Sequence, residues 1–457
     1  MLNRRQFLSS AAAATVPLIF LPKAQARRQR PGANDKIHVG IIGLGGRCRA
    51  VTRVVLDVPD IEIVAVSDCF KPRIAEFKEH FSDHSRNWKE YVDFREMLDK
   101  ENLDAAICIT TTHASSWVAC QVLAAGLDAY IEKAMCLTVE EGRHMVNVAR
   151  RNRAVTQIGT QQRSIPLNNW ASDLVQQGAI GKLVKVEAPN FMGPQLWTPQ
   201  PAQPKPEGGT VGWWDVWTNQ APLRPYHHDL HRGWQRWWDY ENGGVSFGVS
   251  GWGTHSYDQI QRGLGTNWTG PVEVVLQERY EHRPLLKYEQ GREPGPEETG
   301  QDYYWFRDGQ TGLRARVTMR YADGVEVDLC LDADNGPGLG ARFIGEDGYI
   351  EINRDRIWAE PYDIIERDDR PAPLDVDEIK PHLVNWVECM RSRQSCNADI
   401  EYALRSHTLC FLVNAVREYG QVGEVLRWNP EQERFIGNDR ANALMIRERR
   451  KGYELPA

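Results

Sequence analysis

The front part of the chain alternates short apolar runs with stretches of helical periodicity. Each run is of strand length and rich in β-branched residues, a pattern typical of parallel strands that are buried on both faces. The expected strands are 36–42, 61–67, 104–109, 128–131 and 154–158, and the expected helices include 74–81, 91–98, 116–125 and 139–151. This alternation predicts an α/β fold, a doubly wound parallel sheet with right-handed crossovers, over residues 36–158.

From residue 159 the rhythm changes. Residues 183–191 begin with alternating apolar and polar positions, which indicates a half-buried strand. Two Asp-Gly pairs, at 323–324 and 347–348, separate apolar runs and are hairpin signals. We expect an α+β domain over 159–457, with an open, mostly antiparallel sheet that has one covered face. Helices are expected at 382–393 and 400–419.

The first 26 residues have the pattern of an export signal. Arg4-Arg5 precede an apolar run from Ala11 to Leu21, and Ala24-Gln25-Ala26 follow. The run is too short for a permanent membrane span, and the arginine pair resembles the twin-arginine signal of bacteria. We expect residues 1–26 to be a twin-arginine signal peptide and the mature protein to be periplasmic or otherwise exported. An amphipathic N-terminal extension is the alternative.

Composition narrows the function classes. The 457 residues carry a net charge of −7 and contain 41% hydrophobic residues, as expected of a globular protein. Removal of residues 1–26 takes away three cations and no anions, which brings the charge to −10. The chain has no long basic run, so we expect no nucleic-acid partner. An anionic substrate would need a local basic pocket. The Cys and His spacings give no metal site.

A glycine-rich turn follows the first strand directly. Gly43, Gly45 and Gly46 lead into Arg47 and a helical pattern, while Cys48 takes the place of the third glycine of the dinucleotide motif. The first two glycines permit a tight turn and a close approach of the backbone to a pyrophosphate.

An acidic residue, Asp68, ends the second strand, where it would bind the ribose hydroxyls. Its charge favours NAD over NADP. Lys71 and Arg73 lie just beyond it and leave NADP possible.

Three further polar segments lie at expected strand ends, namely 110–113, 132–133 and 159–163. Ligands of doubly wound sheets bind at the carboxyl ends of the strands. We therefore expect these segments to line one crevice beside the cofactor.

At this point the chain resembles the glucose–fructose oxidoreductase/inositol dehydrogenase (Gfo/Idh/MocA) family, and its tail resembles that of exported members. The motifs are Gly43–Arg47, Asp68, Thr110–His113, Glu132-Lys133-Ala134, Gly159–Arg163, Gly178–Lys182, Gly243-Gly244, Gly253–Asp258 and Leu426–Pro430. Three positions depart from the family pattern. Ala134 replaces a proline, Thr111 replaces the proline of a Thr-Pro pair, and Gly251 replaces an aspartate that is common four residues before the active-site histidine.

The resemblance implies a nicotinamide cofactor, loaded before export and tightly bound. It implies cofactor contacts from Gly43, Gly45, Gly46, Arg47, Asp68, Thr110, Thr111, His113, Glu132, Lys133 and Gln161. His255 would act as the base and Lys133 would orient the substrate hydroxyl, which makes these two the expected catalytic residues. The resemblance also implies a homodimer or a homotetramer.

Tryptophan is concentrated in one segment. Eight of the 16 tryptophans fall between residues 197 and 252. Flat aromatic rings stack on sugar rings, although Trp is also common in cores and subunit interfaces. As substrate contacts we expect Trp214, Trp237 and Trp238 from this segment, together with Arg163 and Asp258.

These features predict an exported NAD(P)-dependent oxidoreductase that transfers hydride from a sugar, polyol or glycoside. One alternative is an NAD-dependent glycoside hydrolase or lyase that oxidises its substrate transiently and returns the hydride. An exported enzyme has no free nicotinamide pool, which favours such a cycle. A second alternative is a non-catalytic sugar-binding protein of the same fold.

Overall fold

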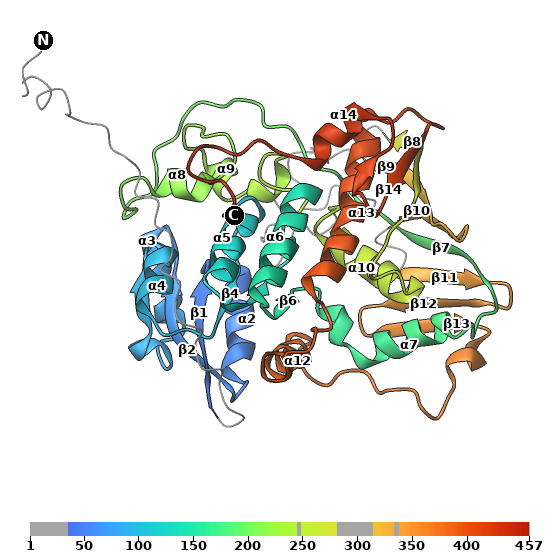
Figure 1. Cartoon of the computed structure of the whole chain (residues 1–457), viewed down its shortest axis with the longest axis horizontal. Coiled ribbons are helices and arrows are strands. Elements are labelled where there is room, and N and C mark those ends of the chain that lie inside the picture. Colours follow the sequence, from blue (N-terminus) through green and yellow to red (C-terminus); the bar gives the residue numbers. More distant parts are fainter. Residues whose placement is uncertain (1–34, 245–247, 281–313, 333–337, 457) are drawn as a thin grey trace, which may run out of the picture.

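The computed structural model describes residues 35–244, 248–280, 314–332 and 338–456. Two sheets lie side by side, each with its own helices (Figure 1). The expected signal peptide, residues 1–26, lies outside the described residues. Across these ranges, no helix combines the length and the apolar character that a membrane span requires.

The first sheet is parallel and has six strands in the order β3-β2-β1-β4-β5-β6. This order confirms the predicted doubly wound sheet. Its strands are β1 (Ile37–Ile42), β2 (Ile61–Ser67), β3 (Lys89–Tyr91), β4 (Ala105–Cys108), β5 (Asp128–Ile131) and β6 (Thr156–Ile158). The crossover helices are α2 (Gly46–Leu56), α3 (Lys71–His80), α4 (Phe94–Lys100), α5 (Thr112–Ala124) and α6 (Val139–Asn152).

Several helix boundaries differ from the expectation; α3 begins at Lys71 rather than at 74, and α5 begins at Thr112 rather than at 116. The helix expected at 91–98 begins only at Phe94, because Tyr91 belongs to the short edge strand β3. Asp93 caps the helix, since its side chain accepts a hydrogen bond from the backbone N–H of Arg95. A three-residue edge strand is too short to stand out in the apolar pattern.

The second sheet has nine strands in the order β13-β12-β11-β7-β10-β9-β8-β14-β15. Only the β7–β10 pair is parallel among the described strand pairs of this sheet, which confirms a mostly antiparallel sheet. The strands are β7 (Leu183–Asn190), β8 (Glu273–Tyr280), β9 (Arg314–Arg320), β10 (Glu326–Asp332), β11 (Ala341–Gly345), β12 (Tyr349–Asn353), β13 (Arg356–Glu360), β14 (Val425–Asn429) and β15 (Arg434–Phe435).

Three helices cover one face of this second sheet; of the two helices expected in this domain, only the one at 400–419 is among them. They are α7 (Pro166–Gln176), α10 (Trp252–Leu264) and α13 (Ile400–Tyr419). A further helix, α12 (Ile379–Ser392), returns to the first sheet, where Leu383 and Trp386 join the apolar core beside α2. The opposite face of the second sheet carries cross-strand ion pairs such as Arg316–Asp328 and Arg342–Glu351.

Between β7 and α10 the chain forms a tryptophan-rich segment, residues 197–244, with the short helices α8 (Trp213–Thr218), α9 (His228–His231) and η3 (Trp234–Arg236). Its buried rings form an apolar cluster of their own together with Phe70 of the first domain. The C-terminal tail fastens the segment, because the Arg450 guanidinium (2.6 Å) and the Tyr453 hydroxyl (2.8 Å) both bind Asp215. The C-terminus lies near α5 (Figure 1).

Candidate functional site: a cavity at the strand ends

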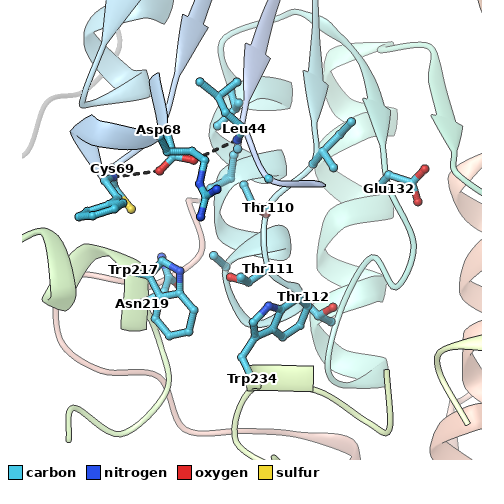
Figure 2. A pocket seen from close by; sticks show the side chains of 18 of the residues that line it. Leu44, Asp68, Cys69, Thr110, Thr111, Thr112, Glu132, Trp217, Asn219 and Trp234 are labelled. Atoms are coloured by element: carbon cyan, nitrogen blue, oxygen red, sulfur yellow. Dashed lines mark hydrogen bonds between the residues drawn. The ribbon is translucent and has the colours of Figure 1, made fainter. Parts of the chain in front are cut away.

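A cavity of about 800 Å³ lies between the carboxyl ends of the first sheet and the tryptophan-rich segment. Its volume falls in the usual range for ligand sites. The glycine turn, the ends of β2, β4 and β5, and residues 250–252 before α10 all contribute to its wall. Figure 2 shows Thr110–Thr112 facing Trp217, Asn219 and Trp234 across the space. Two of the three segments expected to line one crevice, 110–112 and 132–133, contribute to this wall, whereas residues 159–163 do not.

The glycine turn leaves room at one end of this cavity. Gly43 has a φ of +86°, and a Cβ there would collide with the carbonyl oxygen of Ile109. A Cβ on Gly45 would meet no atom within 4 Å, so the backbone is open toward the cavity. Helix α2 starts at the next residue and directs its unpaired N–H groups there. The turn thus fits a pyrophosphate. Cys48, at the position of the third glycine, is fully buried, so its small side chain fits where the motif requires a small residue.

Asp68 lies at the end of β2, on the same cavity wall. Its two carboxylate oxygens accept hydrogen bonds from the backbone N–H groups of Leu44 and Phe70, both at 2.9 Å (Figure 2). Burial raises the pKa of the Asp68 carboxyl group, and the two hydrogen bonds oppose that shift. Arg73 and Arg232 also line the cavity, so two cationic side chains share the wall with Asp68, where we expect the adenosine ribose.

Glu132 and Arg47 form an ion pair at the cavity wall, with 2.9 Å between Arg47 Nε and Glu132 Oε1. The Glu132 carboxylate raises the pKa of the Arg47 guanidinium. Gln161 donates to Glu132 Oε1 at 3.0 Å and to the Tyr130 hydroxyl at 2.9 Å. Gln161 is fully buried and is not part of the cavity wall, so it supports Glu132 from behind.

Lys133 stands at the end of β5 and lines the cavity. Its Nζ donates to the backbone oxygen of Gly251 at 3.0 Å. Burial lowers the pKa of the Lys133 ammonium group, and the Glu132 carboxylate partly restores it. A lysine in this state can orient a hydroxyl and take part in proton transfer.

His255 lies one turn into α10 and is 5% exposed, but it is not part of the cavity wall. Its Nδ1 has no hydrogen-bond partner within the part of the chain that the structure describes. Burial lowers the pKa of the His255 imidazole well below its usual value, and the fields of Arg354 and Lys133 add to this. The ring is therefore neutral at pH 7, which is the form that accepts a proton.

His113 has a structural position rather than a place on the cavity wall. Its ring is fully buried against Trp217 and Tyr240, and its Nε2 lies 2.8 Å from the backbone oxygen of Trp217. Burial lowers the pKa of this imidazole to about 3. We therefore assign His113 to holding the tryptophan-rich segment against α5.

The tryptophans that line the cavity are not the three named from the sequence. Trp213, Trp217, Trp234 and Trp252 lie on its wall. Trp214 is buried behind Trp217, with ring centroids 4.8 Å apart and an interplanar angle of 11°. Trp237 is also buried, with its Nε1 donating to the Asp229 backbone oxygen, and Trp238 lies under the Arg447 guanidinium. Sequence indicated the segment but not which rings face inward.

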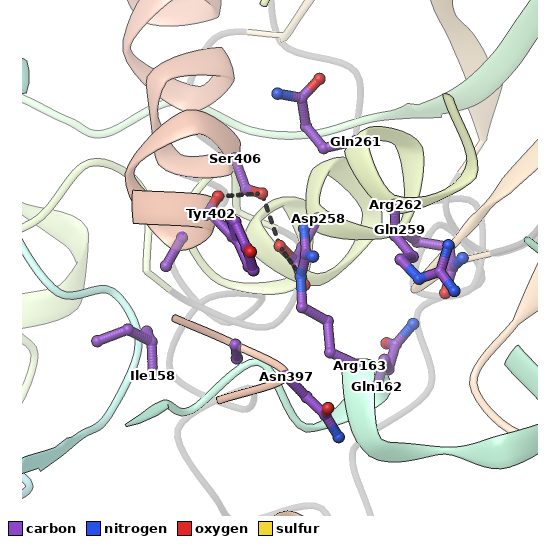
Figure 3. A network of polar contacts seen from close by, with 12 residues as sticks. Ile158, Gln162, Arg163, Asp258, Gln259, Gln261, Arg262, Asn397, Tyr402 and Ser406 are labelled. Atoms are coloured by element: carbon purple, nitrogen blue, oxygen red, sulfur yellow. Dashed lines mark hydrogen bonds and ion pairs between the residues drawn. The ribbon is translucent and has the colours of Figure 1, made fainter. Parts of the chain in front are cut away.

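Arg163 and Asp258 bind each other rather than the cavity. The Arg163 Nε is 2.8 Å from both carboxylate oxygens of Asp258, and both side chains are almost fully buried (Figure 3). The Ser406 hydroxyl donates to Asp258 as well, at 2.6 Å. The pair connects α10, α13 and the turn after β6. A buried pair held between three elements in this way has a packing role, which sequence could not distinguish from substrate binding.

Sequence reasoning missed Asn219 and Glu241, and it placed Thr112 in the crevice without giving it a role; all three line the cavity. Glu241 comes directly before the Asn242-Gly243-Gly244 run, which is the only signal that could have pointed to it. In the described ranges, no group of three or more His, Cys, Asp or Glu side chains is arranged to hold a metal ion.

The fold and the cavity define a dinucleotide-binding protein with a second α/β domain, and comparison with known proteins gives its family. Residues 37–160 match the model of the oxidoreductase family, NAD-binding Rossmann fold. Residues 171–287 and 306–455 match that of the oxidoreductase family, C-terminal α/β domain. The chain belongs to the Gfo/Idh/MocA oxidoreductase family.

Solved structures share the fold at low sequence identity. An aldose–aldose oxidoreductase from Caulobacter crescentus, complexed with glycerol, is 16% identical with a TM-score of 0.56, covering 86% of this chain and 99% of that one. The WlbA dehydrogenase from Bordetella pertussis, in complex with NADH and UDP-GlcNAcA, has the same four values.

A curated relative, a glycosyl hydrolase family 109 protein of Shewanella baltica, is 25% identical over 216 residues. The match covers 41% of this chain and 45% of the relative, so the chain spans about half the length of the curated relatives that it matches.

Proposed function

We propose that this protein is an NAD(P)-dependent oxidoreductase that takes hydride from a carbon of a sugar, polyol or glycoside. The observation that carries the proposal is one cavity whose wall contains the glycine turn, Asp68, Lys133 and several tryptophans. Bound nicotinamide would supply the hydride acceptor. NAD is favoured by Asp68, and NADP stays open because Arg73 and Arg232 lie close by.

The residues of this chain have separate tasks in such a reaction. The open backbone at Gly45 and the start of α2 bind the pyrophosphate, and Asp68 binds the adenosine ribose. Lys133 holds the substrate hydroxyl and stabilises negative charge that develops on its oxygen. His255, which is neutral and interacts electrostatically with Lys133, is the proposed final proton acceptor; because it is not part of the cavity wall, Lys133 would pass the proton to it.

The tryptophan wall supports a carbohydrate as the substrate class. Trp217 and Trp234 are half-buried, so each keeps an apolar surface free toward the cavity. Asn219 and Thr112 lie beside them and offer polar groups to ring hydroxyls (Figure 2). This combination of flat apolar surface and hydrogen-bonding groups suits a sugar ring.

A redox-neutral glycoside hydrolase or lyase is the second candidate, and the match to glycosyl hydrolase family 109 proteins favours it. In that reaction the substrate carbon is oxidised, the leaving group is eliminated, and the hydride returns to the same substrate. The cavity, Lys133 and the tryptophan wall would serve both reactions.

One experiment tests the proposal and separates the two candidates. The full chain is purified, its bound nicotinamide is quantified, and it is incubated with sugars and aryl glycosides. Accumulation of reduced nicotinamide together with an oxidised sugar supports the oxidoreductase. Glycoside cleavage without net reduction supports the hydride-returning cycle. Failure to bind either nucleotide would refute both reactions and leave a sugar-binding role.

We also propose export by the twin-arginine route and assembly into a homodimer or homotetramer. The Arg4-Arg5 signal supports export, and fractionation of cells that express the wild type and an Arg4→Lys, Arg5→Lys variant tests it. The charged face of the second sheet, which no helix covers among the described elements, is the surface proposed for assembly. Light scattering on the purified protein measures its mass.

A further inference from the structure

The Glu241 carboxylate is a buried acid on the wall of the cavity, and no task proposed so far uses it. Its side chain is 2% exposed and belongs to the tryptophan-rich segment, far in sequence from the nucleotide domain. A buried carboxyl group needs partners, because an isolated charge in an apolar environment is strongly unfavourable. The partners of the Glu241 carboxylate therefore indicate its role.

Three neutral groups donate to the carboxylate. The Ser250 hydroxyl (2.6 Å) and the Asn242 backbone N–H (2.7 Å) bind Oε1, and the Thr112 hydroxyl binds Oε2. Thr112 begins α5 and Ser250 lies just before α10, so one carboxylate joins both walls of the cavity. Gly244 makes the position possible, because a Cβ there would come within 2.7 Å of the Glu241 Cδ.

Two cations, Lys133 and the buried Arg447, lie near this carboxylate, and Lys133 is the one that lines the cavity. The ammonium lowers the pKa of the Glu241 carboxyl group, which burial raises, and Glu241 in turn raises the pKa of Lys133. Lys133 Nζ donates a hydrogen bond to the neutral backbone oxygen of Gly251. The backbone N–H of Gly251 binds the oxygen of Gly243, so residues 241–244 fold over the acceptor of Lys133.

Other charged and titratable groups also face Lys133, and their charges are balanced in different ways. Glu132 is paired with Arg47 at 2.9 Å. Arg354, from the turn after β12, is a cation and opposes the protonation of Lys133. The remaining groups are His255 on α10 and His407 and Cys410 on α13, in which burial favours the neutral forms. Glu241 is thus a carboxylate near Lys133 whose hydrogen bonds come from neutral groups.

We propose that Glu241 is a positioning residue of the reaction centre: its buried carboxylate keeps Lys133 protonated and fixes the hydroxyl groups of Thr112 and Ser250, which both bind it. Gly251 offers Lys133 only a carbonyl, and Glu241, ten positions earlier, provides the charge. The inference rests on the proposed function in one respect, because it places the reacting substrate carbon beside Lys133.

The Glu241→Gln variant removes the charge and preserves the hydrogen bonds. The amide oxygen can still accept from Ser250 and Asn242, and the Thr112 hydroxyl can reverse and accept from the amide nitrogen. The matched control is Asp239→Asn in the same segment. Asp239 pairs with Arg224 at 2.6 Å and is not on the wall of this cavity.

The measurement is the pKa of Lys133 in the nucleotide-free protein, followed by NMR with ¹³C-labelled lysine and assigned by loss of the signal in Lys133→Met. We expect Glu241→Gln to lower the Lys133 pKa by roughly one unit, about a tenfold change in its ionisation constant. Asp239→Asn should leave it unchanged. An unchanged Lys133 pKa in a folded Glu241→Gln protein overturns the proposal.

If Glu241→Gln does not fold, the reciprocal variant decides. Lys133→Met should increase the fraction of protonated Glu241 at pH 6, seen as a carboxylic-acid band in the infrared spectrum, and absence of that increase overturns the proposal. Nicotinamide binding by the wild type is measured in parallel. Binding with no shift of the Lys133 pKa refutes this inference alone, whereas a shift without binding supports it and refutes the proposed function.

Discussion

The two glycines of the nucleotide turn should respond in opposite ways to the same substitution. In Gly43→Ala the new methyl group enters a residue with φ of +86° and collides with the Ile109 carbonyl oxygen, which is backbone and cannot move aside. The left-handed conformation costs about 1–2 kcal/mol for a non-glycine residue. Overpacking adds roughly 1–3 kcal/mol. In Gly45→Ala the residue has φ of −73° and the methyl group meets nothing within 4 Å.

We therefore expect Gly43→Ala to lower the free energy of unfolding by about 2–5 kcal/mol, a fall of roughly 5–15 °C in Tm. Gly45→Ala should change the stability of the nucleotide-free protein by less than about 0.5 kcal/mol. It should nevertheless weaken NAD binding at least about tenfold, or 1.4 kcal/mol, because the methyl group fills the space proposed for the pyrophosphate.

The assay combines thermal unfolding without nucleotide and titration with NADH, followed by energy transfer from the tryptophans to the reduced nicotinamide. The two variants control for each other, since one tests the turn and the other tests the space beside it. Wild-type affinity for NADH in Gly45→Ala would refute the placement of the pyrophosphate. A wild-type Tm in Gly43→Ala would refute the strained, crowded turn.

Three other substitutions test separate parts of the cavity and the core. Asp68→Asn should lower the ratio of the NADP Kd to the NAD Kd at least about tenfold, because it removes the charge that repels a 2′-phosphate. An unchanged ratio in nucleotide titrations would contradict the position of Asp68 at the ribose. Trp217→Ala or Trp234→Ala should weaken binding of the sugar substrate by about 1–2 kcal/mol, a five- to thirtyfold rise in Kd by calorimetry, with NADH affinity retained; the exposed Trp358→Ala is the control. Burial lowers the pKa of the His382 imidazole to about 4, so this ring is neutral in the folded protein at neutral pH. Its contribution to stability is complete above pH 6.5 and is lost as the pH falls toward 4, because the unfolded chain takes up a proton there that the folded protein does not. His382→Gln should therefore reduce the loss of stability between pH 6 and pH 5, measured by urea unfolding, by about 1 kcal/mol, whereas the exposed His80→Gln should not.

The nucleotide half of the site was predictable because it is local in sequence. The strand, the glycine turn, the start of α2 and Asp68 all fall within residues 37–68, and their order along the chain dictates their order in space. The strand-end rule then brought Thr110, Thr111, Glu132 and Lys133 to the same wall. His113 and Gln161 follow the same rule in sequence, but their side chains turn away from the cavity into the packed interior.

The opposite wall was not predictable to the residue because it is assembled from distant segments. Trp214 and Trp217 are one helical turn apart, yet the first is buried and the second lines the cavity. Which ring faces inward depends on contacts with Phe70 and with the C-terminal tail, and no local pattern encodes these contacts. Arg163 and Asp258 also lie next to recognisable motifs, but their charges neutralise each other across the interface between α10 and the turn after β6.

The same assembly explains how an acid from an irregular segment can act on a lysine of a rigid sheet. Asn242, the neighbour of Glu241, is held by three elements: its side-chain amide donates to the Leu137 oxygen at 3.0 Å, its side-chain oxygen accepts from Arg447, and its backbone oxygen accepts from Asn414. Long loops are usually the most variable and mobile parts of a protein. Here the nucleotide domain, α13 and the C-terminal tail all restrain the loop at the position next to the acid. The position of Glu241 relative to Lys133 is therefore set by the whole fold, and the tail, although it lies outside the cavity wall, contributes to the geometry of the reaction centre.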